Sequence, residues 1–155
     1  MVRWGLNIPL ILLNREMIGG RLAALFLLVT GVFSANTLKD CSAGTSVFKY
    51  GSASLLPDPV VPGENSTLSI SSVIPEGVTV TDGTAKYSLS LNGIPFPATV
   101  DPLCSQVECP LVSGPYSNTT VSVFPSGVSG KIVSKIEWFD TSSTLLYCLE
   151  VTTRV

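Results

Sequence analysis

Histidine is absent from the 155-residue chain, and charged residues make up only 13% of it, about half the ~25% typical of soluble proteins. The absence of histidine removes the commonest general base near neutral pH and a frequent zinc ligand. The later carboxylates, Asp101, Glu108, Glu137, Asp140 and Glu150, show no spacing typical of acid–base catalysis. We therefore expect no enzymatic activity, no cofactor and no metal site.

Clusters of basic residues are also missing. Beyond residue 35, six lysine and arginine residues are scattered among ten acidic residues, which gives a net charge of −4. Nucleic-acid binding and firm electrostatic attachment to anionic membranes both require clustered positive charge. We therefore expect no nucleic-acid partner.

The chain has no hydrophobic run long enough to cross a bilayer comfortably, but it has a short one near its start. Arg21 precedes eight apolar residues, 22–29, and small residues follow. This order is typical of a secretory signal peptide, whereas a bilayer crossing needs ~20 apolar residues. We predict a signal peptide over residues 1–35, with Met17 as an alternative start. A signal anchor that uses both N-terminal apolar runs is the competing interpretation.

Cysteines are few, and all four follow the predicted signal peptide: Cys41, Cys104, Cys109 and Cys148. An even number in an exported chain indicates disulfides, and four cysteines allow three pairings. We favour Cys104–Cys109, which clips a short loop, with Cys41–Cys148, which ties the start of the domain to its last strand. A zinc site is disfavoured because no C-x-x-C spacing is present.

Two N-glycosylation sequons occur, N-S-T at Asn65 and N-T-T at Asn118. Either one alone could arise by chance. Combined with a signal peptide, they predict two exposed, glycosylated positions in a secretory lumen.

Helical periodicity and internal repeats are absent beyond Cys41, where short alternating segments are separated by turn residues. We predict strands over residues 47–56, 67–74, 84–91, 96–100, 119–124, 131–139 and 145–153. The predicted turns between them include Pro75-Glu76-Gly77, Asn92-Gly93 and Ser113-Gly114-Pro115. About seven strands at this spacing indicate one all-β domain over residues 36–155, an immunoglobulin-like β-sandwich.

The segment Ile94-Pro95-Phe96-Pro97 follows the Asn92-Gly93 turn. Its prolines restrict the backbone and remove two ladder donors, so we expect an edge or loop with little freedom. An apolar side chain held there is a candidate gate to an apolar interior. We interpret the segment as the mouth of a lipid-sized cavity between the two sheets.

Several motifs, in their order, resemble the ML lipid-recognition domain family. They are Asp40-Cys41, L-L-P-D-P-V-V-P-G-E (55–64), I-P-F-P (94–97), C-x4-C-P (104–110), E-W (137–138) and Y-C-L-E-V (147–151). The first two are similar to the phosphatidylglycerol/phosphatidylinositol transfer branch, and the others resemble the luminal Niemann-Pick type C sterol carrier. The chain lacks the additional cysteine pair of the animal sterol carrier. The resemblance covers about residue 38 onward and leaves sterol and phospholipid both open as ligands.

This resemblance implies a monomeric carrier, secreted or in the endolysosomal or vacuolar lumen, that contacts membranes transiently and encloses a sterol or phospholipid between its sheets. The candidate lipid-binding residues are Phe96 and Ile94 at the mouth and Tyr116, Trp138 and Tyr147 in the wall. Ordinary core packing is the favoured interpretation for the last three, and for Phe96 the alternative is a loop side chain that plugs the end of the sandwich. An accessory protein that presents lipid to a hydrolase or receptor, and a structural module without a cavity, are the alternative functions.

Overall fold

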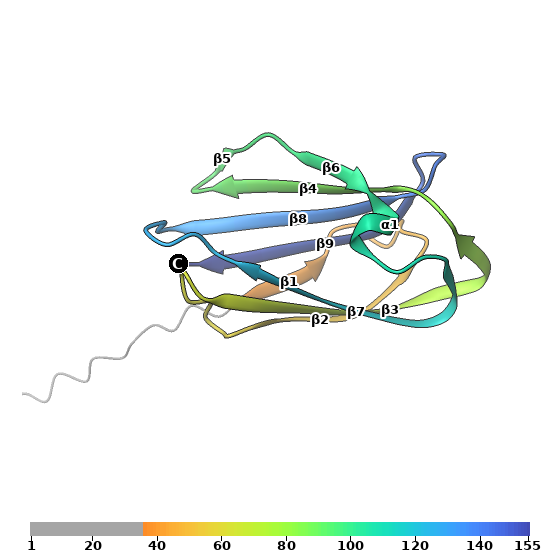
Figure 1. Ribbon diagram of the computed structural model, residues 1–155, viewed down its shortest axis with the longest axis horizontal. Helices are drawn as coiled ribbons and strands as arrows, with labels where there is room; N and C mark the ends of the chain where they lie inside the picture. The colour runs from red at the N-terminus through yellow and green to blue at the C-terminus, as the bar shows by residue number, and fades with distance from the viewer. Residues whose placement is uncertain (1–35) are drawn as a thin grey trace, which may run out of the picture. The chain divides into compact units, whose positions relative to one another are not determined.

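The computed structural model describes residues 36–155, so the predicted signal peptide and the start at Met17 lie outside the described residues. The elements are β1 (Thr37–Asp40), β2 (Lys49–Leu56), β3 (Asn65–Val80), β4 (Thr84–Leu91), β5 (Ile94–Pro95), β6 (Thr99–Pro102), α1 (Leu103–Gln106), β7 (Leu111–Val123), β8 (Lys131–Phe139) and β9 (Leu145–Arg154) (Figure 1). Within residues 36–155, no helix has the length and apolar character that a membrane crossing requires.

The strands form two antiparallel sheets that face each other. One sheet has the order β1-β9-β8-β4-β5, with β6 also paired to β4, and the other has the order β2-β3-β7. Figure 1 shows β4, β8 and β9 running together as one layer, with β2, β3 and β7 as the second. The predicted all-β, immunoglobulin-like sandwich is confirmed, with nine strands described instead of about seven.

Alternation along the strands sends apolar side chains into the space between the sheets. In β8, Ile132 and Trp138 are buried. Lys135 and Glu137 lie on the opposite face of the same strand and form an ion pair of 2.8 Å. Because successive side chains of a strand point to opposite faces, this period of two separates core from surface.

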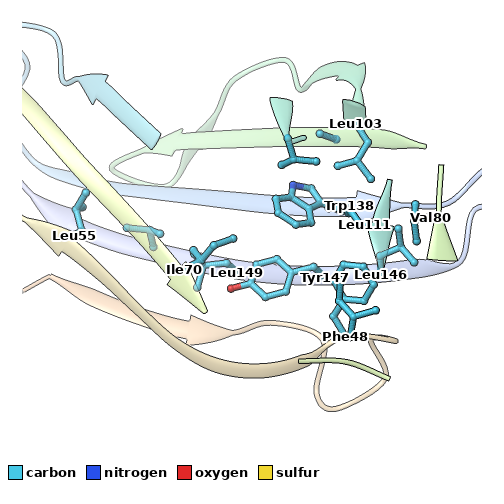
Figure 2. Packing of buried hydrophobic residues seen from close by; sticks show 14 of the residues in the cluster. Phe48, Leu55, Ile70, Val80, Leu103, Leu111, Trp138, Leu146, Tyr147 and Leu149 are labelled. Atoms are coloured by element: carbon cyan, nitrogen blue, oxygen red, sulfur yellow. The ribbon is translucent and has the colours of Figure 1, made fainter. Parts of the chain in front are cut away.

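The core is densest at the end of the sandwich that carries α1. Phe48, Leu103 and Leu146 are each at most 2% exposed. Figure 2 shows these side chains clustered at one end with Val80 and Leu111, while Leu55 lies at the other end. The sandwich is therefore closed by packed side chains on the α1 side.

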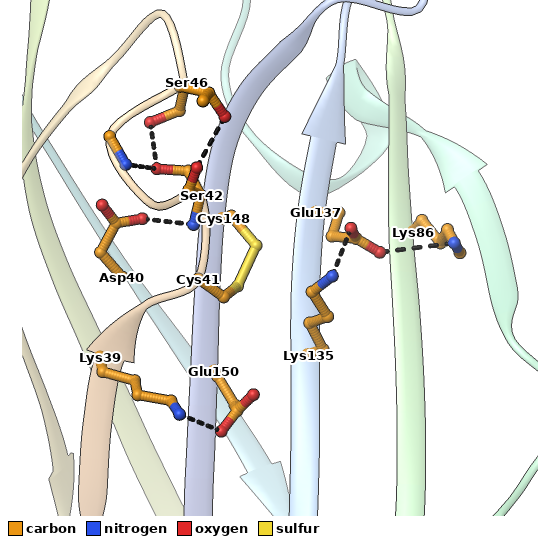
Figure 3. Close-up of a disulfide and its surroundings, with 12 residues drawn as sticks. Lys39, Asp40, Cys41, Ser42, Ser46, Lys86, Lys135, Glu137, Cys148 and Glu150 are labelled. Carbon is orange, nitrogen blue, oxygen red and sulfur yellow. Dashed lines mark hydrogen bonds and ion pairs between the residues drawn. A yellow bond between two sulfur atoms is a disulfide. The ribbon is translucent and has the colours of Figure 1, made fainter.

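The two disulfides have the pairing favoured from the sequence. Cys41–Cys148 joins the loop after β1 to β9, with a Cα–Cα distance of 5.2 Å across a sequence separation of 107. Cys104–Cys109 joins α1 to the residues just after it. In Figure 3 the first bond lies beside a tight loop in which the Ser42 amide donates to the Asp40 carboxylate at 2.8 Å. β1 and β9, the first and last strands in the chain, are thus paired in the sheet and also linked by a disulfide next to this pair.

Two of the predicted turns lie inside strands and were wrong. β3 continues through Pro75, and the register with β7 shifts between Ile74 and Thr79. Gly77 has φ of 78° there, which suits a bulge. Pro115 lies in β7, an edge strand, which is the kind of strand in which proline is tolerated. Turn-forming residues therefore mark a bulge and an edge in this sandwich.

The predicted strand over residues 96–100 is confirmed only at its end, where residues 99–100 belong to β6. In the described part of the chain, residues 96–98 belong to no strand and link β5 to β6, although the Phe96 N–H donates to the Leu89 carbonyl in β4. The prolines at 95 and 97 cannot donate to a ladder, so this part of the edge is interrupted. β1 was missed because a four-residue strand carries too little alternation to be recognised.

Candidate functional site

A cavity of about 400 Å³ opens between the two sheets. Both sheets contribute to its wall, with Leu55, Leu68, Thr120, Ser122 and Phe124 from one side and Tyr87, Ser88, Leu89, Phe96, Pro97, Thr99, Ser134, Lys135, Ile136 and Val151 from the other. The wall is mainly apolar, with several hydroxyl groups. Its volume falls in the range of small-molecule binding sites, roughly 300–1,000 Å³.

A second, much smaller cavity of about 40 Å³ adjoins the first. The two share Leu68, Tyr87, Thr120 and Ile136 as wall residues. The smaller cavity also contacts Trp138, which belongs to the dense part of the core. The site is therefore a slot that narrows toward the closed end of the sandwich.

Phe96 and Ile94 occupy different positions at the mouth. Phe96 lines the larger cavity and is 48% exposed, and its backbone N–H donates to the Leu89 carbonyl at 2.8 Å. Ile94 lies on β5, is 69% exposed, and falls outside the residues that line the described cavities. The structure thus places Phe96 at the rim and Ile94 on the surface beside it.

The three predicted aromatic wall residues form one packed group. The ring of Trp138 lies 5.2 Å from that of Tyr147 and 6.1 Å, edge-on, from that of Tyr116. Trp138 and Tyr147 line the smaller cavity, whereas Tyr116 packs behind Trp138. Burial raises the pKa of Tyr116 to about 12. Burial, with smaller effects of Tyr50 and Asp40, also raises the pKa of Tyr147, so both phenols are uncharged at neutral pH.

Two polar atoms of this group are buried without a hydrogen-bond partner in the described part of the chain, namely Trp138 Nε1 and the Tyr147 hydroxyl. Figure 2 shows the Tyr147 oxygen directed toward Ile70 and Leu149, which both line the smaller cavity. Unpaired buried polar groups are rare in folded proteins. The narrow end of the slot is therefore not uniformly apolar.

The charged side chains nearest the cavity lie on the outer face of the larger sheet. Among residues 36–155, Lys135 is the one charged residue that contributes to the larger cavity's wall, and alternation along β8 directs its side chain outward. Its Nζ lies 2.8 Å from Glu137, and Lys86 approaches the same carboxylate at 3.4 Å (Figure 3). Partial burial opposes ionisation of Glu137, but the hydrogen bonds and charges of Lys135 and Lys86 outweigh it and lower its pKa.

The sequence reading missed the polar residues that β7 turns inward. Asn118 was expected to be an exposed sequon, but it pairs with Ile70 in the ladder, is half-buried and lines the smaller cavity. Asn65, at the start of β3, is exposed as expected. The missed signal is the alternation of Tyr116, Asn118 and Thr120 on one face of β7.

Comparison with known proteins identifies the family. The ML domain profile matches residues 35–155. A Dictyostelium discoideum protein named phosphatidylglycerol/phosphatidylinositol transfer protein 2 is 28% identical over 136 residues, which cover 84% of this chain and 94% of that protein. A second Dictyostelium discoideum protein, with a different designation but also named for phosphatidylglycerol/phosphatidylinositol transfer, is 26% identical over 136 residues, which cover 84% of this chain and 95% of the relative.

Solved structures share the fold at low sequence identity. A Niemann-Pick type C2 protein from the Japanese carpenter ant aligns with a TM-score of 0.58 at 18% identity, covering 76% of this chain and 98% of that one. Chicken MD-1 complexed with lipid IVa aligns with a TM-score of 0.55 at 12% identity, covering 79% of this chain and 90% of that one. With the profile matched over the whole sandwich, the chain belongs to the ML domain family.

Proposed function

We propose that this protein is a lipid carrier that encloses one sterol or phospholipid between its sheets and moves it between membranes. The apolar cavity of about 400 Å³ supports this proposal most directly. Burying apolar surface is worth about 25 cal/mol per Å², so a hydrocarbon ligand gains free energy by leaving water for this slot. Membership of the ML domain family, and relatives named for phospholipid transfer, agree with this function.

The mouth of the cavity supplies a way to load and unload. Phe96 and Ile94 are exposed apolar side chains on a proline-restricted edge. They can enter the outer part of a bilayer while the cavity faces it, so that the lipid passes between the two apolar phases with little exposure to water. The contact is transient because it involves few side chains and no cluster of positive charge. This function requires no covalent step and a single copy of the chain.

Two disulfides suit an oxidising compartment, and we propose secretion or residence in the endolysosomal or vacuolar lumen. The cavity favours a carrier over a purely structural module, because such a module gains nothing from an unfilled apolar space. A lipid-presenting role for a hydrolase or receptor would use the same cavity. It would differ by a stable protein partner that a pull-down, with and without lipid, would detect.

The central test measures binding and transfer in the purified protein. Native mass spectrometry should show a co-purified lipid, and the protein should speed transfer of dehydroergosterol or pyrene-labelled phosphatidylglycerol between vesicles. Leu89→Trp places a larger side chain in the cavity and should abolish transfer. Val100→Trp, at an exposed position outside the cavity wall, should leave transfer unchanged. Absence of binding to either lipid at micromolar concentrations would refute the carrier function.

A further inference from the structure

The edge strand β7 carries a stripe of uncharged polar side chains toward the interior. Its ladder with β3 places Thr120 opposite Leu68 and Asn118 opposite Ile70, and Ser122 follows on the same face. Thr120 and Ser122 line the larger cavity, and Asn118 and Thr120 line the smaller one. We call Asn118, Thr120 and Ser122 the β7 stripe. It runs from the mouth toward the narrow end of the slot.

Two of the outward neighbours of the stripe are apolar, whereas a third, Thr119, is polar. Val121 and Val123 are 62% and 56% exposed on the outer face of the same strand. An ordinary half-buried strand places apolar side chains inward and polar ones outward. Asn118 is half-buried, and Thr120 and Ser122 are exposed where the slot opens, so these polar groups are accessible to a ligand that enters it.

The polar side chains of the β7 stripe are available to hydrogen-bond a ligand. On the outer face, the hydroxyls of Thr119 and Ser69 form a hydrogen bond at 3.2 Å. The hydrogen bonds found within residues 36–155 include none made by the side chains of the β7 stripe. A hydroxyl or amide offers both donors and acceptors, and water or a ligand must satisfy them here.

The cavity wall, as far as residues 36–155 form it, offers no free positive charge to an anionic headgroup. The stripe is uncharged, and the ammonium group of Lys135 lies on the outer face of β8, where it is paired with Glu137 at 2.8 Å. A phosphate would therefore find no free cation in the wall for a charge-assisted hydrogen bond, which is the stronger kind. An uncharged hydroxyl group matches the amide and hydroxyls of the stripe without needing a counter-charge.

We propose that the β7 stripe hydrogen-bonds the hydroxyl group of a neutral lipid and makes the cavity prefer such a lipid to an anionic phospholipid. This inference rests on the lipid-carrier function proposed above. Asn118 is then a ligand contact and not a carbohydrate attachment site, because a glycan on its inward side chain would fill the space between the sheets. The exposed Asn65 is the position that takes a glycan.

The binding test compares ligands that differ only in the hydroxyl group. Lipids displace the fluorescent apolar probe N-phenyl-1-naphthylamine from delipidated protein. Cholesterol should bind roughly tenfold more tightly than 5-cholestene, which lacks the hydroxyl, because one neutral hydrogen bond contributes about that factor. Cholesterol should also bind more tightly than dioleoyl phosphatidylglycerol.

Variants then assign the preference to residues. Asn118→Leu and Thr120→Val should each lower the affinity for cholesterol to that for 5-cholestene. The affinity for 5-cholestene should change little. Thr119→Val alters the adjacent, outward residue of the same strand and should keep the full preference. An unchanged preference in both inward variants, or tighter binding of phosphatidylglycerol by the wild type, would overturn this inference while leaving the carrier function intact. Failure of every lipid to displace the probe would overturn both.

Carbohydrate mapping gives a second readout that needs no variant. Protein secreted from a glycosylating eukaryotic cell is digested, and the peptides that contain each sequon are weighed before and after glycan removal. The Asn65 peptide should carry a glycan and the Asn118 peptide should not. A glycan on Asn118 in lipid-loaded protein would contradict the assignment of this residue to the cavity.

Discussion

Phe96 holds its position at the mouth through its backbone more than through core packing. Its N–H donates to the Leu89 carbonyl at 2.8 Å, and prolines on both sides restrict the segment. The side chain is 48% exposed, so it contributes less to folding than a buried phenylalanine would. A residue of this kind can be changed to test binding without disrupting the sandwich.

We predict that Phe96→Ala weakens lipid binding about tenfold, because it removes roughly 1–2 kcal/mol of apolar contact with the ligand. The melting temperature of the lipid-free protein should fall by less than about 3 °C. Ile94→Ala is the matched control, since Ile94 lies outside the cavity wall. It should leave binding in solution unchanged and slow only vesicle-to-vesicle transfer. Equal losses of binding in both variants would argue against a special role for Phe96 at the rim.

Glu137 links pH to stability. The hydrogen bonds and charges of Lys135 and Lys86 outweigh partial burial and hold its pKa below the ordinary value of 4.5. The unfolded chain therefore takes up a proton at this group before the folded chain does as the pH falls. The stability that Glu137 contributes is present above about pH 4.5 and is lost as the pH falls through its lowered folded pKa.

We predict that Glu137→Gln lowers the free energy of unfolding by about 1 kcal/mol at pH 7 and that this difference disappears as the pH falls through the lowered pKa of Glu137 in the folded protein. Urea denaturation at several pH values measures both quantities. Glu76→Gln, at an exposed position in β3, serves as the control and should have little effect at any pH. If the loss of unfolding free energy in Glu137→Gln stayed constant with pH, the effect would not come from the charge of Glu137.

At the scale of elements, β1 depends on its neighbour. It has four residues and, within residues 36–155, pairs only with β9 in the larger sheet, and Cys41–Cys148 links the chain just beyond this pair. A short edge strand gains little from its own hydrogen bonds, so the covalent link limits its fraying. The same link restricts the unfolded chain over a sequence separation of 107 residues.

We predict that replacing Cys41 and Cys148 together by serine costs about 4–5 kcal/mol of unfolding free energy in the chain-entropy view. The Cys104–Cys109 bond closes a much shorter loop, so replacing both of its cysteines by serine should lower the free energy of unfolding by only about 2 kcal/mol. Denaturant titration of both variants measures the ratio, and lipid binding at low temperature should survive in each. Equal costs would show that loop length does not govern the effect.

The elements also show where sequence patterns mislead. Pro75, Gly77 and Pro115 are turn residues by composition, yet all three lie within the long strands β3 and β7. A bulge and an exposed edge use the same residues as a turn, because each needs an unusual φ or dispenses with one N–H. Only the pairing between the strands distinguishes these cases. By contrast, the Asn92-Gly93 turn was predicted correctly, and both residues have positive φ.

At the scale of the whole molecule, the two sheets are packed at one end and separated at the other. The closed end holds Phe48, Leu103 and Leu146, and the open end holds the cavity of about 400 Å³. Unfilled apolar space lowers stability because its lining lacks contacts. A ligand that fills the slot should therefore stabilise the folded protein by mass action.

We predict that saturation with a bound lipid raises the melting temperature, and that a free lipid concentration of 100 times Kd adds about 2.7 kcal/mol to the free energy of unfolding. Differential scanning calorimetry with and without cholesterol or phosphatidylglycerol measures the shift. The cavity-filling variant Leu89→Trp should lose the shift, since it occupies the same space. A shift that persisted in this variant would place the lipid elsewhere on the protein.

The sequence by itself determined the β-sandwich, the family and the unusual edge around Phe96, and it favoured one of three possible cysteine pairings. These follow from local signals, namely alternation of period two, turn residues, cysteine spacing and motif order. The tertiary structure alone decided that Trp138 and Tyr147 line the narrow end of the slot, that Ile94 lies outside it, and that Asn118 faces inward. Alternation tells which residues share a face of a strand. Which face meets the interior, and how far the sheets stand apart, depends on strands far apart in the chain.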